Sequence, residues 1–203
     1  MGLTGTPQRL GMFGGAFDPP HVAHVSLARA AVEQLQLDEL RVFPTGHAWH
    51  KTLPSTPAPD RLAMSQIAFA DLPRTVVDDS EMRRPGPTYT IDTLRELKAA
   101  HPAAELFLVM GEDQAVAITR WREWEEVLSL ATLCMAARPA AGSPAPAQPE
   151  MPAQARVRLL DLPVMPESAT QVRERVAAGL GIAHLVPPGV ARYIDQHSLY
   201  QPA

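Results

Sequence analysis

Residues 12–24 read MFGGAFDPPHVAH, and we interpret the rest of the chain outward from this stretch. The apolar run at residues 10–13 ends at the glycine pair 14–15. This pattern is typical of a buried strand followed by a tight turn, because glycine lets the backbone bend sharply or approach a ligand closely. Asp18 is a suitable N-cap, and Pro19 is favoured at a first helical position. The sequence therefore predicts a strand, a glycine turn and a helix, in that order.

The predicted helix has an apolar stripe and two histidines near its start. The stripe consists of Val22, Val25, Leu27, Ala28, Ala31, Val32 and Leu35. His21 and His24 are three residues apart, so both imidazoles are expected on one face of the first turn. Backbone N–H groups and the positive end of the helix dipole point the same way. A glycine pair or an H-x-x-H pair alone is more often a plain turn, a metal half-site or a coincidence, but together they predict a phosphate site.

Composition limits the class of protein. A chain of 203 residues suits one α/β domain, and its net charge of −4 argues against a protein that coats nucleic acid. Cys134 is the only cysteine, so we expect a buried thiol in a reducing compartment and no disulfide framework. No apolar segment approaches the roughly 20 residues that cross a bilayer. We expect a cytoplasmic protein with a small-molecule substrate and with neither nucleic-acid nor membrane association.

Apolar runs and helical patterns alternate along the chain. Further strands are expected at residues 40–44, 75–77, 105–110, 130–137 and 156–160, and helices at 60–69, from about 90, after 168 and within 185–200. The alternation predicts an α/β, Rossmann-like three-layer sandwich with a mostly parallel sheet. We interpret residues 1–203 as one domain, with 140–155 as an exposed, weakly ordered connection and 156–203 as its C-terminal strand and helices. The segment 78–87 is polar and without periodicity.

Five positions at predicted element ends have both a plain and a functional interpretation. Lys51, in a loop, is a solvated charge or a mobile cation for phosphates beyond a strand end. Asp113 is a helix N-cap or an acceptor for ribose hydroxyls, and Trp121 is half-buried packing or a stacking surface for a heterocycle. Helix capping alone accounts for Thr90 and Ser168. The residue pattern alone does not decide between these interpretations.

Two stretches resemble the signatures of the nucleotidyltransferase superfamily. Residues 12–24 are similar to G-x-F-D-P-x-H-x-G-H, with Ala23 where that family usually has glycine. Residues 167–173, ESATQVR, resemble the second signature I-S-S-T-x-x-R, whose hydroxyls, backbone N–H groups and arginine hold a triphosphate. Glu167 and Ala169 depart from it, and Glu167 brings a carboxylate near a polyanion. The resemblance implies transfer of a nucleotidyl group to a phosphate acceptor.

Other segments resemble the bacterial nicotinate-nucleotide adenylyltransferases. Residues 49–51 are similar to a Pro/His-Lys element, and residues 88–90, TYT, to a Ser-Tyr-Thr element beside the nicotinate ring. Trp121 matches a tryptophan that lies against the pyridine ring, and residues 185–200 match the closing segment. The matches follow the family's order over nearly the whole chain. The resemblance implies that deamido-NAD and pyrophosphate are made from ATP and nicotinate mononucleotide in NAD biosynthesis, by direct in-line attack without a protein nucleophile.

The resemblance also implies which residues form the site. The expected catalytic residues are His21, His24, Lys51 and Arg173. The expected ATP-binding residues are Gly14, Gly15, Phe17, His21, His24, Arg138, Ser168, Thr170 and Arg173. The expected mononucleotide-binding residues are Phe13, Gly15, Ala16, Lys51, Tyr89, Thr90, Asp113, Trp121 and Arg122. Mg²⁺ is expected to arrive bridging the phosphates of ATP, so no metal site built from protein ligands is expected.

Two alternative functions stay open. A sister adenylyltransferase acting on nicotinamide mononucleotide or pantetheine phosphate shares the first signature, although those substrates do not explain the Trp121 region together with the closing segment. A catalytically silent nucleotide-binding module is the alternative outside enzymes, because Ala23, Glu167 and Ala169 depart from the signatures. Turnover assays with each acceptor separate these functions. The sequence leaves open a homo-oligomer and the strictness of selection between acid and amide.

Overall fold

The computed structural model describes residues 8–46, 56–136 and 151–202. Within these ranges the strands are β1 (Arg9–Gly15), β2 (Glu39–Pro44), β3 (Thr75–Val77), β4 (Glu105–Val109), β5 (Ala131–Ala136) and β6 (Val157–Leu160). They form one sheet in the order β3-β2-β1-β4-β5-β6, and every pair is parallel. This is the doubly wound order, in which the direction of winding reverses between β1 and β4 and opens a crevice at their carboxyl ends.

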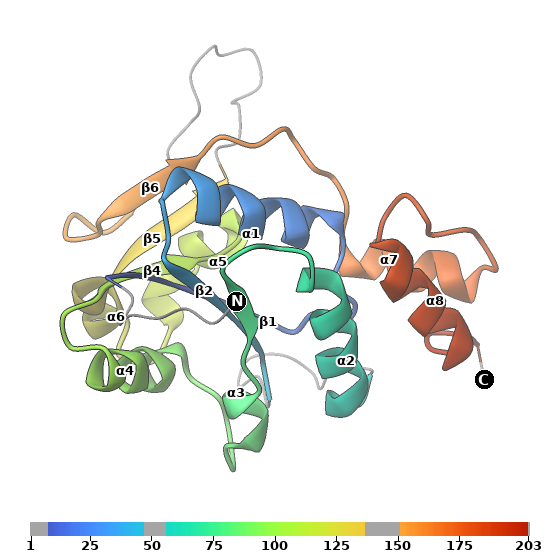
Figure 1. Cartoon of the computed structure of the whole chain (residues 1–203), viewed down its shortest axis with the longest axis horizontal. Helices are drawn as coiled ribbons and strands as arrows, with labels where there is room; N and C mark the ends of the chain where they lie inside the picture. The colour runs from blue at the N-terminus through green and yellow to red at the C-terminus, as the bar shows by residue number, and fades with distance from the viewer. Residues whose placement is uncertain (1–7, 47–55, 137–150, 203) are drawn as a thin grey trace.

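Helices cover both faces of the sheet (Figure 1). They are α1 (Val22–Gln34), α2 (Ala58–Phe69), α3 (Ser80–Arg83), α4 (Thr90–Ala100), α5 (Glu112–Val116), the 3₁₀ turn η1 (Ile118–Arg120), α6 (Trp124–Leu130), α7 (Ala169–Ala177) and α8 (Pro188–Gln196). Figure 1 shows α7 and α8, in orange and red, on the side of the molecule where α2 lies. The predicted three-layer α/β sandwich is confirmed.

Side chains of β1 alternate between two hydrophobic cores. Leu10 and Met12 point into a core shared with α4 and α6, whereas Phe13 points into the core on the opposite face. That second core contains apolar residues of α1, α2, α7 and α8, among them Val172 and Ile194. The period of two is what a strand buried on both faces requires. The packing on both faces fixes β1 at the centre of the sheet, with its carboxyl end at the crevice.

Two local predictions around β1 are wrong. Gly14 and Gly15 belong to the strand and not to a turn, because the parallel pairing with β2 continues through both residues. The helix starts at Val22 and not just after Asp18, and its N-cap is His21. The Asp18–Pro19 peptide is cis, and Pro19 lies outside the helix. Asp18 does not cap α1, because its carboxylate accepts a hydrogen bond from Tyr200 and its carbonyl one from Arg173.

Segment 78–87, expected to be irregular, contains α3. Asp78 Oδ1 accepts a hydrogen bond of 2.9 Å from the Ser80 amide, which closes the backbone at the helix start, and Glu81 is buried. Of the predicted connection 140–155 only residues 151–155 are described, and Met151 and Ala155 pack against the core of α4 and α6. That described end is therefore not a fully exposed linker. In the described ranges, no helix combines the length and apolarity needed to cross a membrane.

Candidate active site

A cavity of about 1230 Å³ opens at the carboxyl ends of β1 and β4. It is enclosed by the turn after β1, the first turns of α1, α5 and α7, the segment before α4, and the chain preceding α7. The predicted site residues that line it are Phe13, Gly14, Gly15, Ala16, Phe17, His21, His24, Tyr89, Thr90, Asp113, Trp121, Arg122, Ser168, Thr170 and Arg173. Lys51 and Arg138, also predicted, lie outside the described residues.

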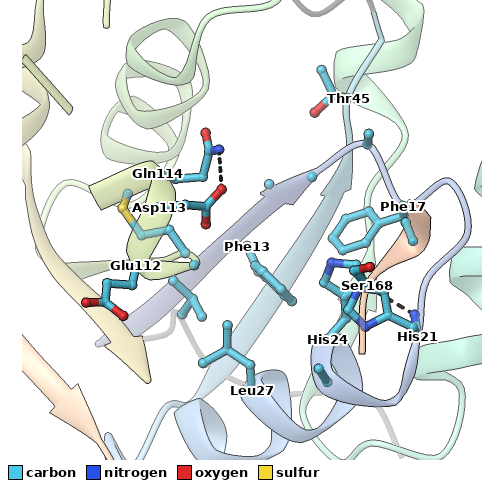
Figure 2. A pocket seen from close by; sticks show the side chains of 18 of the residues that line it. Phe13, Phe17, His21, His24, Leu27, Thr45, Glu112, Asp113, Gln114 and Ser168 are labelled. Carbon is cyan, nitrogen blue, oxygen red and sulfur yellow. Dashed lines mark hydrogen bonds between the residues drawn. The ribbon is translucent and has the colours of Figure 1, made fainter. Parts of the chain in front are cut away.

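The two histidines stack on each other at the start of α1. Their ring centroids are 3.7 Å apart, and the amide of His21 donates a hydrogen bond of 3.2 Å to Nδ1 of His24 (Figure 2). Because Nδ1 accepts this bond, the neutral imidazole of His24 carries its proton on Nε2. Burial lowers the pKa of His21 to about 4, so His21 is neutral at pH 7. His24 can therefore present Nε2–H to the cavity, and His21 adds no positive charge beside it.

An aromatic support lies beneath His24. The ring of Phe17 contacts the His24 ring edge-on, with centroids 5.1 Å apart, and also packs against Phe13 and Phe69. Phe17 adopts a left-handed backbone conformation, with φ of 47°. A Cβ atom added at Gly15 would lie 3.0 Å from the Phe17 ring, so a larger residue there would press on the ring and require it to move by a few tenths of an ångström. The glycine thus serves ring packing, and Phe17 orients a histidine.

The start of α7 faces the same cavity. Ser168 is its N-cap, and the hydroxyl accepts a hydrogen bond of 3.2 Å from the amide of Gln171, as capping predicts. Arg173 donates to Oγ1 of Thr170 at 3.2 Å and to the carbonyl of Asp18 at 2.7 Å. This guanidinium therefore joins the two signature segments. Glu167 also lines the cavity, and its Oε2 atom is buried without a hydrogen-bond partner among the described residues.

The opposite end of the cavity is built from the starts of α4 and α5 and the residues after η1. Arg122 lies over the ring of Tyr89, with the guanidinium carbon 4.7 Å from the ring centroid. Thr90 is the first residue of α4 and does not cap it, since the N-cap is Tyr89. Trp121 lines the cavity and also packs against the core of α4 and α6. The position of Trp121 is thus compatible with both interpretations of its ring, as half-buried packing and as a stacking surface for a heterocycle.

Asp113 lies in the first turn of α5, facing the cavity. The N-cap of α5 is Gly111, so the alternative of Asp113 as N-cap is wrong. Its Oδ2 atom accepts a hydrogen bond of 3.0 Å from Gln114. A Cβ atom at Gly111 would come within 2.6 Å of Oδ1, so the small residue leaves room for this carboxylate. In Figure 2, Asp113 and His24 lie on opposite sides of Phe13.

Glu81 is a cavity residue that the sequence analysis missed. It is only 3% exposed, and its Oε1 atom accepts a hydrogen bond of 2.7 Å from the hydroxyl of Thr93. Burial raises the pKa of Glu81 to about 7, although the bond from Thr93 and the charge of Arg84 act in the opposite direction. The only signal in the sequence is one glutamate in an aperiodic polar segment, which indicates exposure rather than burial.

Arg61 is a second missed residue, and it acts behind the cavity. Its side chain is 2% exposed and donates to the backbone carbonyls of Ala16 at 2.8 Å, Thr56 at 3.3 Å and Gly46 at 3.4 Å. Ala16 lines the cavity, so this buried cation fixes the backbone of the turn after β1. An arginine on the apolar face of a predicted helix is the signal that could have marked it.

The first turns of α1 and α7 contain no Asp or Glu. Acidic residues are favoured in first turns because they offset the partial positive charge of the helix start, so their absence leaves both N-termini available to an anion. His21, His24 and Arg173 share this end of the cavity. The fold and the site thus define an α/β protein that binds a phosphorylated nucleotide at the switch point of a doubly wound sheet.

Comparison with known proteins identifies the family within this class. The cytidylyltransferase-like family model matches residues 12–175. A protein of Albidiferax ferrireducens named "Probable nicotinate-nucleotide adenylyltransferase" is 55% identical over 197 residues, which cover 97% of this chain and 100% of that protein. A protein of the same name from Methylibium petroleiphilum is 42% identical, covering 98% and 96% of the two chains. The chain belongs to the nicotinate-nucleotide adenylyltransferases, within the cytidylyltransferase-like family.

Solved structures show the same fold at low sequence identity. The nicotinic acid mononucleotide adenylyltransferase of Plasmodium falciparum complexed with NaAD superposes with a TM-score of 0.78 at 20% identity, covering 95% of this chain and 97% of that chain. The same enzyme complexed with APC gives a TM-score of 0.75 at 19% identity, with the same coverage. The resemblance drawn from the two signatures is confirmed by the relatives, and the fold is confirmed by these structures.

Proposed function

We propose that the chain transfers the adenylyl group of ATP to nicotinate mononucleotide, giving deamido-NAD and pyrophosphate. The observation that carries this proposal is one cavity with two different ends. The acid-free starts of α1 and α7, His21, His24 and Arg173 form an end suited to a polyphosphate. Tyr89, Trp121 and Asp113 lie at the other end, where an aromatic ring and ribose hydroxyls have partners.

The chemistry needs no protein nucleophile. A phosphate oxygen of the mononucleotide attacks the α-phosphorus of ATP in line with the bond to the leaving pyrophosphate, so one P–O bond forms as the other breaks. The protein then has to align the reactants and stabilise charge that develops on the α-phosphate. In this proposal Nε2–H of His24 donates to that phosphate, beside the neutral His21, while Arg173 neutralises the adjacent phosphates. Lys51 has the same proposed role.

Further ATP contacts follow from the lining of the phosphate end. The proposed ATP-binding residues are Gly14, Gly15, Phe17, His21, His24, Arg138, Ser168, Thr170 and Arg173, all but Arg138 being cavity residues. The oxygen of the Ser168 hydroxyl accepts from the amide of Gln171, so its O–H can still donate to phosphate, together with the remaining N–H groups at the start of α7. Phe17 is 2% exposed and contributes mainly by supporting His24. Glu167, with its buried Oε2 atom, and Asp18 are carboxylates at this end that oppose an anion.

Mg²⁺ is proposed to bind together with ATP. Among the residues that the structure describes, no group of three or more His, Cys, Asp or Glu could hold a metal ion. At the phosphate end Arg173, His21 and His24 suit phosphate oxygens better than a hard cation, and Asp18 and Glu167 are the carboxylates that line the cavity there. The donor set thus fits an ion held mainly by the phosphates, where it neutralises negative charge. The steps assigned here to His24 and Arg173 do not depend on its position.

The mononucleotide is proposed to occupy the opposite end. Its binding residues are Phe13, Gly15, Ala16, Lys51, Tyr89, Thr90, Asp113, Trp121 and Arg122, all but Lys51 lining the cavity. Asp113 accepts hydrogen bonds from ribose hydroxyls, and Trp121 stacks on the pyridine ring. Arg122 and the hydroxyl of Thr90 are donors for the carboxylate of nicotinate, which has no hydrogen to donate at neutral pH. A cytoplasmic location, a single domain and a homo-oligomer stay predictions.

Pyrophosphate release tests the proposed function. The purified chain is incubated with ATP and Mg²⁺ and with nicotinate mononucleotide, pantetheine phosphate or no acceptor. We expect release only with nicotinate mononucleotide, and deamido-NAD as the second product. Release with pantetheine phosphate alone would identify a sister enzyme, and ATP binding without release under any condition would identify a silent nucleotide-binding module.

A further inference from the structure

We propose that Tyr200 is a positioning residue for the phosphate end of the cavity and acts on it through Asp18 and Arg173. This inference rests on the proposed adenylyl transfer for its consequence in catalysis. Tyr200 does not line the cavity, whereas Asp18 and Arg173 both do. Its influence on bound ligands must therefore pass through residues that it holds.

The contact between Tyr200 and Asp18 joins the closing segment of the chain to the turn after β1. The phenol donates a hydrogen bond of 2.7 Å to Oδ1 of Asp18, across 182 positions in the sequence. Asp18 is 6% exposed, so its carboxylate has exchanged water for protein donors. Burial raises the pKa of Tyr200, and the neighbouring carboxylate adds to that effect, so the phenol keeps its proton and remains a donor over the whole range of physiological pH.

The same aspartate holds the arginine of the second signature. The carbonyl of Asp18 accepts a hydrogen bond of 2.7 Å from Nη1 of Arg173, while Nη2 donates to Thr170 at 3.2 Å. One residue of the turn after β1 thus contacts Tyr200 with its side chain and Arg173 with its backbone. A displacement of Asp18 changes where the guanidinium lies in the cavity.

The turn between β1 and α1 depends on such external contacts. Residues 16–21 belong to no helix or strand, so their backbone groups need partners from elsewhere. Arg61 holds the carbonyl of Ala16, and the carbonyl of Leu185 accepts from the amide of Val22 at 2.9 Å. Tyr200 holds Asp18, which lies between Ala16 and Val22. The Tyr200 contact therefore holds the part of the turn that carries the backbone acceptor of Arg173, the carbonyl of Asp18.

The chain contains a matched contact away from the cavity. Tyr193 in α8 donates a hydrogen bond of 2.9 Å to Oδ1 of Asp60 in α2. Like Tyr200, it is a tyrosine of the closing segment bound to an aspartate carboxylate of the body of the protein. Neither Tyr193 nor Asp60 lines the cavity. Replacing each tyrosine by phenylalanine removes one hydroxyl and its bond to an aspartate, and at Tyr200 also a side-chain hydrogen bond with Thr56. Comparing the two variants separates positioning from general stability.

The first experiment compares Tyr200→Phe with Tyr193→Phe in the full chain. Steady-state rates with ATP and nicotinate mononucleotide give kcat and both KM values, and thermal unfolding monitors stability. We expect kcat to fall about tenfold in Tyr200→Phe, since small misplacements of catalytic groups have effects of this order. The KM for the mononucleotide should stay within about twofold. Tyr193→Phe should keep all three constants within about twofold. An equal loss of kcat in both variants, or no loss in Tyr200→Phe, would overturn the inference.

A double-mutant comparison tests whether Tyr200 acts through Arg173. If it does, Tyr200→Phe should lower kcat by less than about twofold when introduced into an Arg173→Ala background, because the group it positions is already absent. A full tenfold loss in that background would show that Tyr200 acts by another route and would contradict the proposed path.

Hydrogen exchange tests the inference without relying on activity. Amide exchange of residues 16–22 should be at least about tenfold faster in Tyr200→Phe than in the unmodified chain, and unchanged in Tyr193→Phe. If the unmodified chain releases no pyrophosphate, the proposed function fails while this measurement still decides whether Tyr200 holds the turn. Equal exchange in all three proteins would overturn the positioning role.

Discussion

The first turns of α1 and α7 contain no acidic residue, whereas α5, across the same cavity, begins with Glu112 and Asp113. Asp and Glu are common in first turns because they offset the helix dipole. At α5 the protein meets that preference with its own carboxylates. At α1 and α7 no acidic residue of the first turn offsets the dipole, so an anionic ligand can do so. The donors His24 and Arg173 line the cavity at the same place.

The phosphate end and the opposite end of the cavity also differ in their buried titratable groups. Burial lowers the pKa of His21 at the phosphate end and raises the pKa of Glu81 at the other. In both cases desolvation disfavours the charged form. The lesson is that burial keeps these two groups neutral or partly protonated, while a cation lines each end of the cavity, Arg173 at one and Arg122 at the other. The ligands then supply the charges that the donors are placed to bind.

Removal of a hydrogen-bond donor from the phosphate end of the cavity should have the largest effect on catalysis. We expect His24→Ala to lower kcat by about 10²-fold or more, the size typical of one preorganised donor, with little change in ATP affinity. Initial rates and ATP titration measure both quantities. His184→Ala is the control, because His184 is exposed and does not line the cavity. An unchanged kcat in His24→Ala would remove the histidine from the mechanism.

A new carboxylate at the phosphate end should have the next largest effect. Ala169 is the first residue of α7 and lines the cavity, and Ala58 is the first residue of α2 and does not. We expect Ala169→Asp to raise the KM for ATP about tenfold, equivalent to about 1.4 kcal/mol of repulsion. Aspartate at a first helical position favours the helix, so the protein should remain folded. An equal change in KM for the control Ala58→Asp would show that the effect is not local.

A separate effect, on stability and not on catalysis, is expected in the pH dependence of unfolding. The pKa of Glu81 is about 7 when folded against an ordinary 4.5, so the folded state holds the proton more tightly. The contribution of Glu81 is fully present below about pH 4.5 and is lost as pH rises through 7, by about 1.4 kcal/mol per pH unit within that window. The free energy of unfolding of Glu81→Gln, relative to the unmodified chain, should therefore rise between pH 5 and pH 6.5. A constant difference would contradict the burial argument.

His21 should show the opposite sign. Its pKa is about 4 when folded against an ordinary 6.5, so its contribution is present above about pH 6.5 and is lost as pH falls through 4. Relative to the unmodified chain, His21→Gln should therefore become more stable as pH is lowered from 6.5 to 4.5. Chemical denaturation of both variants over one pH series measures the two slopes together. If the relative stabilities of Glu81→Gln and His21→Gln changed with pH in the same direction, burial would not disfavour the charged form of both residues.

The sequence predicted those features that depend on local pattern. Apolar runs and helical spacing located the strands and most helices, and the two signatures contain ten of the predicted site residues that the cavity brings together. Ser168 as N-cap is confirmed, because capping depends on neighbouring residues alone. Family resemblance, rather than spacing, supplied the mononucleotide end. Lys51 and Arg138 lie outside the described residues and stay predictions.

Features set by contacts between distant residues could not be predicted in this way. Asp18 has the residue type of an N-cap, but its carboxylate is bound by Tyr200, 182 positions away. Arg61 and Glu81 are charged residues that local rules place at the surface, and both are buried because backbone carbonyls and Thr93 satisfy them. Such partners become visible only once the topology is known.

The relative efficiency with nicotinate and nicotinamide mononucleotides tests the central claim most directly. A site that offers N–H and O–H donors to a carboxylate leaves the NH₂ group of the amide facing other donors, which costs on the order of 1 to 3 kcal/mol per group. At matched ATP and Mg²⁺ we expect kcat/KM to favour the acid at least tenfold. Equal efficiencies, or a preference for the amide, would contradict the donor end formed around Thr90 and Arg122.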